Sequence, residues 1–272
     1  MTKNSELISV IMAVYNCEDC VSKSIESILN QTYENWEFII CDDCSTDNTC
    51  EIVKQYCEKY PDKIKLVRNE KNSKLSYSLN HCLKYAKGKY VARMDADDTS
   101  EPERFEKQIE FLKNNPEINL VGTAMKVFDG KVIDGVRTSK YEPTKLDLRF
   151  NSCFAHATIM TYKSVYDSLG GYLVSRRTQR GQDFDLWFRF FAKGYRGVNL
   201  PDPLYVITED KNAFKRKKYR YRFYATLTAL NGYRLVKMPI YYYPFAFKPL
   251  ISGLVPINFK KRLRKIIKPT KV

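Results

Sequence analysis

Apolar and polar positions follow two alternating periods along the first 115 residues. Runs rich in β-branched and aromatic residues, typical of strands, lie at 7–14, 36–41, 64–68 and 90–94. After each run, apolar residues recur at spacings of three and four, which predicts a helix. This alternation with short connections predicts an α/β fold with a mostly parallel, Rossmann-like sheet covered by helices on both faces.

The pattern changes after residue 120. Residues 120–128 and 131–133, joined at Asp129-Gly130, predict a β-hairpin. A polar loop at 175–181 precedes an aromatic helix, and Asp183 at its start is a candidate N-cap. We therefore divide the chain into a body over 1–210, whose halves meet near residue 115, and an extension over 211–272.

The start of the fourth helix carries its own signals. Ser100-Glu101-Pro102-Glu103 predicts a capping box with proline in the first turn. Asp98, just before it, is assigned to the same cap.

The net charge of +15 is concentrated in the extension, which holds 17 Lys and Arg and no Asp or Glu. Basic residues interleaved with Tyr and Phe suit an anionic membrane surface. Four prolines in its apolar part argue against a spanning helix. We favour membrane-surface binding over packing on the body or a homodimer contact, and nucleic-acid binding least.

Eight cysteines without a secretion signal indicate reduced thiols and a cytoplasmic protein. Cys17 with Cys20, and Cys41 with Cys44, match a zinc-site spacing. Cys41 ends an apolar strand and the first pair begins a helix, so packing explains them better than zinc.

Polar residues follow each predicted strand, at Tyr15-Asn16, Asp42-Asp43, Arg68-Asn69 and Asp95-Ala96-Asp97. Ligands of parallel sheets bind outside these carboxyl ends, so we expect the four segments to line one crevice. Asp95 and Asp97, two apart on an extended chain, face the same side. Two such carboxylates suit a hard divalent cation that also holds phosphate oxygens; an acidic turn that caps the next helix is the alternative.

Other polar residues beside these ends are weaker candidates. Asn69, Lys74 and Arg93 are placed for phosphate or base contacts, but a solvated charge or a structural pair is the favoured explanation of each. His156 is a candidate donor or acceptor contact or a buried, hydrogen-bonded histidine. Three arginines in the 175–181 loop are candidate counter-charges for a diphosphate.

Seven stretches together resemble inverting family 2 glycosyltransferases with the nucleotide-diphospho-sugar-binding GT-A fold, in the bacterial branch that builds capsule and other surface polysaccharides. The stretches are SVIMAVYN (9–16), SILNQTYENWEFIICDDCSTDNT (27–49), LNHCLKYAKGKYVARMDADD (79–98), PERFEKQIEFLKNNPEINLVGT (102–123), HATIM (156–160), LGGY (169–172) and GQDFDLWFRF (181–190). They occur in the expected order over about 7–207, which is more specific than any single motif. The body would then be a GT-A catalytic domain, with a nucleotide-sugar half over 1–115 and an acceptor half over 116–210.

The resemblance implies a role for each matching position. Ala13, Val14 and Tyr15 would lie along the uracil or ribose, and Asp42 and Asp43 would hold base and ribose. Asp97 with Asp95 would hold Mg²⁺ or Mn²⁺ and the donor diphosphate, and Asp183 would be the catalytic base. His156, Gln182 and Gly171 would be candidate contacts of donor or acceptor. Two positions depart from the family pattern. Cys44 stands where glycine is usual, and Gln182 where many members have glutamate.

The implied function is metal-dependent, inverting transfer of a sugar from a nucleotide-diphospho-sugar, such as a UDP-hexose or UDP-N-acetylhexosamine, to a hydroxyl of a glycan or lipid-linked acceptor. The enzyme would work peripherally on the cytoplasmic face of the membrane. Two alternatives stay open. A nucleotidyltransferase making the activated sugar usually has a Gly-rich loop, which 7–21 lacks. A zinc-binding, non-catalytic module would use the cysteine pairs.

Overall fold

The computed structural model describes residues 6–150, 152–209 and 219–254. One nine-stranded sheet runs through the molecule in the order β3-β2-β1-β4-β8-β6-β9-β5, and β7 pairs with β6. The strands are β1 (Ile8–Val14), β2 (Trp36–Asp42), β3 (Ile64–Arg68), β4 (Tyr90–Arg93), β5 (Thr99–Ser100), β6 (Leu120–Phe128), β7 (Ile133–Arg137), β8 (Met160–Tyr162) and β9 (Gly197–Thr208). The helices of the body are α1 (Val21–Leu29), α2 (Thr49–Lys59), α3 (Leu75–Leu83), α4 (Arg104–Asn114), α5 (Lys163–Leu169) and α6 (Gln182–Ala192), with 3₁₀ turns η1 (Lys145–Arg149), η2 (His156–Thr158) and η3 (Arg176–Thr178).

Strand β1 is buried on both faces because helices cover both sides of the sheet. Val10 and Met12 pack in one apolar cluster with Ile25 of α1. Ile11 points the opposite way, into a second cluster with Leu79 of α3. The continuous apolar run of β1 is thus that of a central strand in a doubly covered sheet, as predicted.

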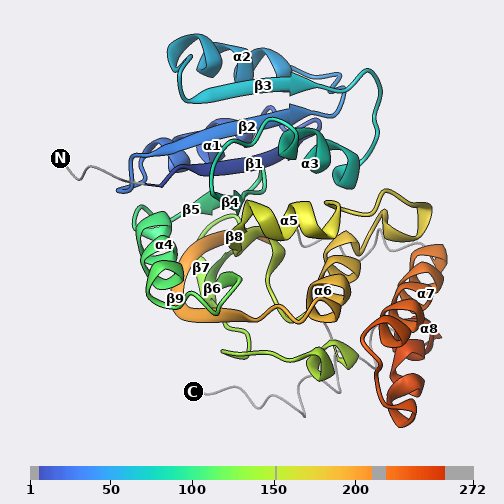
Figure 1. Cartoon of the computed structure of the whole chain (residues 1–272). Helices are drawn as coiled ribbons and strands as arrows, with labels where there is room; N and C mark the ends of the chain where they lie inside the picture. Colours follow the sequence, from blue (N-terminus) through green and yellow to red (C-terminus); the bar gives the residue numbers. More distant parts are fainter. Residues whose placement is uncertain (1–5, 151, 210–218, 255–272) are drawn as a thin grey trace.

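The carboxyl ends of the first four strands share one edge. β3, β2, β1 and β4 are all parallel, with Val14 opposite Asp42 and Asp42 opposite Arg68. Beyond β4 the sheet is mixed, because β8 runs antiparallel between β4 and β6 while β9 runs parallel to β6. Figure 1 shows these parts as an upper, blue layer of strands and a lower, green-to-orange part.

The start of the fourth helix differs from the prediction. Helix α4 begins at Arg104, and Glu103 at its N-cap makes no side-chain capping bond. Thr99 and Ser100 instead form β5, antiparallel to β9. The predicted capping box is wrong because tertiary strand pairing takes the residues that would have formed it.

Two further boundaries shift. The hairpin forms, but its second strand is Ile133–Arg137 and not 131–133. Helix α6 begins at Gln182 with Gly181 as N-cap, in a left-handed conformation (φ 125°). Asp183 therefore lies inside the first turn and is not the cap that the sequence predicted.

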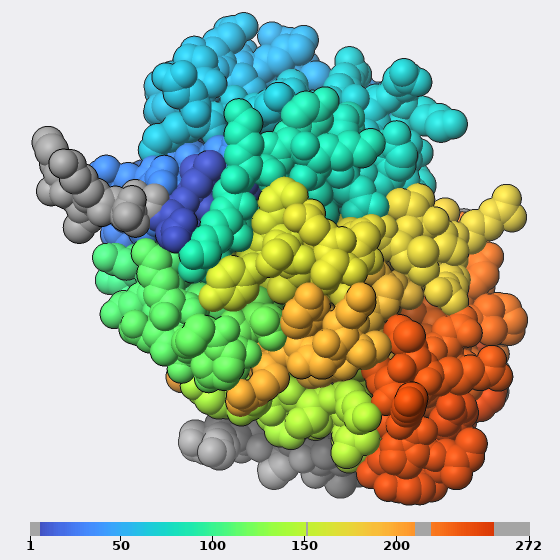
Figure 2. Space-filling view, in the orientation of Figure 1, coloured from blue at the N-terminus to red at the C-terminus, as the bar shows by residue number. Residues whose placement is uncertain are grey.

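The described part of the extension packs against α6. It consists of α7 (Tyr219–Leu235), η5 (Ile240–Phe247) and α8 (Lys248–Leu254), drawn in red in Figures 1 and 2. Tyr233 of α7 lies edge-on to Phe188 of α6, with ring centroids 5.8 Å apart. Lys145 Nζ donates to the carbonyl of Val236 at 3.0 Å.

The rest of the extension, 211–218 and 255–272, lies outside the described residues. No described helix combines the length and apolar character needed to cross a bilayer. Membrane-surface binding stays a prediction.

The contact between α7 and α6 depends on a glycine. A Cβ at Gly232 would overlap the Phe188 ring. We expect Gly232→Ala to lower the free energy of unfolding by about 1–3 kcal/mol, the usual cost of overpacking, as measured by urea denaturation. Asn231→Ala, an exposed neighbour on α7, is the control. Equal midpoints for the two variants would contradict this packing.

Candidate active site

A buried arginine fixes the acidic end of β4. The Arg93 side chain is only 1% exposed, and its Nη2 pairs with Asp95 Oδ1 at 2.5 Å. Its Nη1 donates to the carbonyl of Met94. Sequence analysis placed Arg93 among donor contacts; in the structure it lies beneath the surface and orients Asp95, so we now treat it as a positioning residue.

The next two acids have different environments. Asp97 is exposed, yet reduced access of water to its carboxylate, followed by the charge of Asp95, raises its pKa. Asp98 is buried and accepts a 2.8 Å hydrogen bond from the Thr208 amide of β9. Burial raises the pKa of Asp98 to about 8. The prediction that Asp98 caps a helix is wrong, because its carboxylate is tied to β9.

Asp95 and Asp97 suit a divalent cation. No hydrogen bond or ion pair joins Asp97 to another side chain in the described part of the chain, so its carboxylate is free to bind a cation. Across the same residues, no three His, Cys, Asp or Glu groups form a metal cluster. Mg²⁺ usually takes one or two carboxylates together with substrate phosphates, so a two-carboxylate site fits it better than an all-protein cage.

The turn after β2 is held by Asp42. Its carboxylate is fully buried, pairs with Arg68 Nε at 3.0 Å and accepts from the Ser45 amide. Cys44 within this turn has φ 64°, in the left-handed region that favours glycine. The turn therefore keeps the conformation for which glycine is usual in the family, although this chain has cysteine.

Asp43 points to the other side and holds the segment after β3. It accepts from Asn69 Nδ2 at 2.8 Å and from the amides of Ser73 and Lys74 at 2.7 and 2.9 Å. Asn69 Oδ1 in turn lies 2.8 Å from His81 Nδ1. Asp43 and Asn69 thus shape this edge of the sheet, and the prediction that they contact the donor stays a prediction.

A pocket of about 270 Å³ opens at this edge. It is lined by Ser73, Lys74, Ser76, Val174, Ser175, Arg176 and Gln179, so it joins the segment after β3 to the loop before α6. Tyr15 is 48% exposed at the neighbouring end of β1, while Val14 is buried and Ala13 partly so. Of the predicted nucleotide contacts, Tyr15 and Lys74 are the accessible side chains.

The three loop arginines take separate directions. Arg176 lines the pocket just described. Arg177 Nη2 lies 3.5 Å from Asp185 Oδ1 in α6, and Arg180 lies over the ring of Tyr221, 5.0 Å from its centroid. In this conformation the three arginine side chains are therefore not arranged to contact one diphosphate together.

Asp183 has the environment of a general base. It is partly exposed in the first turn of α6, and burial raises its pKa, against hydrogen bonds from the Phe184 amide and the Ser152 hydroxyl. The positive charge of Arg93 acts on both Asp183 and Asp97. The two predicted functional acids, 86 residues apart in sequence, are therefore both within electrostatic range of one buried cation.

His156 belongs to a buried hydrogen-bonded chain. Its Nε2 lies 2.7 Å from the Tyr172 hydroxyl, which lies 2.7 Å from that of Tyr166. Burial, with Arg93 next, lowers its pKa well below 6.5. The hydrogen-bonded alternative describes His156 better than a direct substrate contact.

Gly171 and Gln182 also have local partners. A Cβ at Gly171, where φ is 71°, would lie 2.5 Å from Asn80 Oδ1. Asn80 itself bonds the amide and carbonyl of Tyr172, so the glycine allows a close approach between loop and α3. Gln182 Oε1 accepts from the Gly181 amide at 3.1 Å.

Sequence reasoning missed two supporting residues. Tyr205 of β9 accepts a 3.1 Å hydrogen bond from the Asp95 amide. Fully buried Arg104 donates to the carbonyls of Arg93 and Ile159 and, through Nε, to Gln108. The only sequence signal was polar Arg104 and Gln108 at i, i+4 on an apolar helix face.

Sequence comparison decides the family. The chain matches the Glycosyl transferase family 2 model over residues 9–170, more than half its length. It belongs to glycosyl transferase family 2. Membership favours glycosyl transfer over both the nucleotidyltransferase and the zinc-binding module.

Relatives of this family 2 chain have named roles. A putative glycosyltransferase, EpsE of Bacillus subtilis, is 45% identical over 95% of this chain and 93% of its own length. TuaG of the same organism, a putative teichuronic acid biosynthesis glycosyltransferase, is 30% identical over 81% and 86%. The Escherichia coli UDP-Glc:alpha-D-GlcNAc-diphosphoundecaprenol beta-1,3-glucosyltransferase WfaP is 31% identical over 74% and 78%. The resemblance to the surface-polysaccharide branch is confirmed.

Solved structures confirm the GT-A fold of this glycosyltransferase. S. aureus TarS residues 1–349 in complex with UDP-GlcNAc superposes with a TM-score of 0.70 at 18% identity, over 93% of this chain and 77% of that one. The mannosyltransferase PcManGT of Pyrobaculum calidifontis, with GDP-Man and Mn²⁺, gives 0.63 at 18% identity, over 95% and 78%.

The partly buried His156 makes stability depend on pH. In the unfolded chain the pKa of His156 returns to about 6.5. Below that pH, His156 is therefore protonated in the unfolded chain but stays neutral in the folded protein. We expect the free energy of unfolding to lose about 1.4 kcal/mol per pH unit below 6.5 from this residue. His156→Gln should remove that slope in urea denaturation at pH 7, 6 and 5. His81 is present in both proteins, so identical slopes would contradict the assignment.

Proposed function

We propose that this family 2 enzyme transfers a sugar from a UDP-sugar, with inversion and with a divalent cation, to a hydroxyl of a lipid-linked saccharide in surface polysaccharide synthesis. One observation carries the proposal. Arg93 orients Asp95 at a solvent-facing strand end, next to the exposed Asp97.

Asp95 and Asp97 would hold the metal and thereby the donor diphosphate. When bound, Mg²⁺ or Mn²⁺ supplies positive charge that stabilises the departing diphosphate. Arg93 keeps one Asp95 oxygen engaged and so fixes the direction of the other. Tyr15 and Lys74 would contact the nucleotide where the crevice is open to solvent.

Asp183 would remove the proton of the acceptor hydroxyl. The acceptor oxygen forms a bond to the anomeric carbon, the bond from that carbon to the phosphate oxygen breaks, and UDP departs with the electron pair. The proton ends on the Asp183 carboxylate. One displacement inverts the anomeric centre, and a raised pKa brings the base closer to working pH.

The substrate class follows from similar proteins. The WfaP relative is named for UDP-Glc and a diphosphoundecaprenol-linked acceptor. TarS, of like fold, binds UDP-GlcNAc, and a like-folded mannosyltransferase binds a nucleotide-sugar with Mn²⁺. A lipid-linked acceptor would place this enzyme peripherally on the cytoplasmic membrane face, where the basic extension suits anionic lipid.

The metal site predicts a loss of binding. Asp97→Asn removes the charge without changing the size of the side chain, so we expect Mn²⁺-dependent UDP binding to fall by at least about tenfold. Calorimetry with UDP, with and without Mn²⁺, measures this. Asp62→Asn, an exposed acid after α2, is the control. Unchanged Mn²⁺-dependent binding in Asp97→Asn would remove the residue from the metal site.

The base predicts a different defect. Asp183→Asn should keep UDP binding and lose turnover by about 10²- to 10⁴-fold, the usual contribution of a positioned general base. Sugar release from UDP-glucose and UDP-N-acetylglucosamine, with transfer to a soluble GlcNAc-diphospholipid analogue, gives the rates. Full turnover in this variant would show that another group takes the proton.

A further inference from the structure

A second, larger pocket lies between the extension and the body. It has a volume of about 470 Å³ and is lined by η1, the start of α6, and α7, η5 and α8. Phe184 and Arg180 lie in its wall, next to and three residues before Asp183. The pocket therefore lies against the first turn of α6, the turn that carries the proposed base.

The charges of this pocket are unbalanced. Its lining includes Arg149, Arg180, Arg222 and Lys248 and no Asp or Glu. None of the four makes an ion pair in the described part of the chain. They contact neutral groups instead: Arg222 Nη1 donates to Pro249 O and Ser252 Oγ, and Lys248 Nζ donates to Phe150 O. Cations gathered in a cleft without carboxylates favour an anionic ligand.

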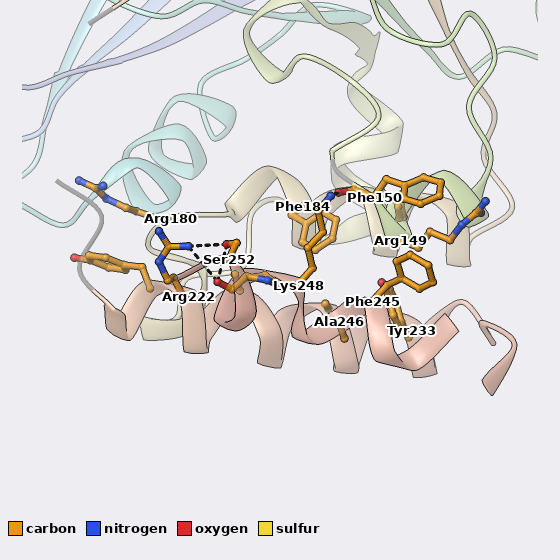
Figure 3. A pocket seen from close by; sticks show the side chains of 15 residues that line it. Arg149, Phe150, Arg180, Phe184, Arg222, Tyr233, Phe245, Ala246, Lys248 and Ser252 are labelled. Carbon is orange, nitrogen blue, oxygen red and sulfur yellow. Dashed lines mark hydrogen bonds between the residues drawn. The ribbon is translucent and has the colours of Figure 1, made fainter. Parts of the chain in front are cut away.

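The lining of the pocket changes along its length. Figure 3 shows Arg180 and Arg222 at one end, and Arg149 with the rings of Phe150 and Phe245 at the other. An adjoining pocket of about 390 Å³ shares Phe245, Lys248 and Ser252 with the first and is completed by Pro244 and by Ile251, which is 59% exposed. A ligand that fills both parts needs an anionic head and a long apolar tail.

We infer that this pocket binds the lipid diphosphate of the acceptor. The diphosphate lies at Arg180 and Arg222, its attached saccharide points toward Asp183, and the first isoprenoid units run over Phe245 toward Ile251. This assignment rests on the proposed function, because it names where that acceptor is held. It gives the extension a role in substrate recognition.

Binding of farnesyl diphosphate to the full-length protein tests the inference. Calorimetry is done with UDP and Mn²⁺ at saturation, so that the donor site is filled. We expect farnesyl diphosphate to bind, and inorganic pyrophosphate and farnesol to bind at least about tenfold more weakly, since each lacks one half of the ligand.

Charge removal supplies the decisive variants. Arg222→Gln and Arg180→Gln should each weaken farnesyl diphosphate binding about tenfold, the loss expected for one charge-assisted contact. Arg234→Gln, the same charge change at an exposed position of α7, should bind like the wild type. Arg222 also holds α8, so the thermal unfolding of the variants is compared. Arg180 contacts the ring of Tyr221 and makes no ion pair among the described residues, so Arg180→Gln keeps the test valid if Arg222→Gln is unstable.

Three results would overturn the inference. Farnesyl diphosphate affinity is unchanged in Arg180→Gln and Arg222→Gln, or pyrophosphate binds as tightly as farnesyl diphosphate. In the third, the wild type binds phosphatidylglycerol vesicles but not farnesyl diphosphate, and both variants no longer bind the vesicles. That result would show that the pocket recognises membrane lipid. Absence of UDP binding to the wild type would instead contradict the proposed function, so the two failures are distinguishable.

Discussion

The site depends on one buried cation, Arg93. A guanidinium excluded from water must keep charged and polar partners close, because an unpaired buried charge costs several kcal/mol. Asp95 and the Met94 carbonyl engage the two terminal nitrogens of Arg93, while its buried Nε has no hydrogen-bond partner among the described residues. Arg104 with Tyr205 secures the backbone around it. The orientation of Asp95 is therefore set before any substrate binds.

The same cation influences groups that come from distant parts of the chain. Its charge lowers the pKa of Asp97 and Asp183 against the effect of burial, and contributes to keeping His156 neutral. The nucleotide side is arranged differently. There, Asp42 and Asp43 hold two turns through backbone amides, so the crevice is shaped by structural carboxylates.

The extension changes the molecule more than its composition indicated. Its described helices pack on α6, the helix that carries Asp183, and close a cationic, aromatic pocket beside it. The basic extension, which the sequence predicted to bind a membrane surface, thus also packs on the body and lines a pocket there. Its charges have no carboxylate partners within that pocket, and this makes it a candidate for substrate recognition.

The sequence alone determined the α/β alternation, the shared edge of strand ends, and the positions of Asp95, Asp97 and Asp183. These follow from local rules: the apolar period sets each element, and parallel strands must present their carboxyl ends together. Tertiary structure decided what no local rule contains. Ser100 pairs with β9 as part of strand β5, and Asp98 accepts a hydrogen bond from β9. Arg93 is buried and pairs with Asp95, and His156 is hydrogen-bonded to Tyr172. Each of these depends on a partner from a distant part of the chain, so burial and pairing there override the local signal.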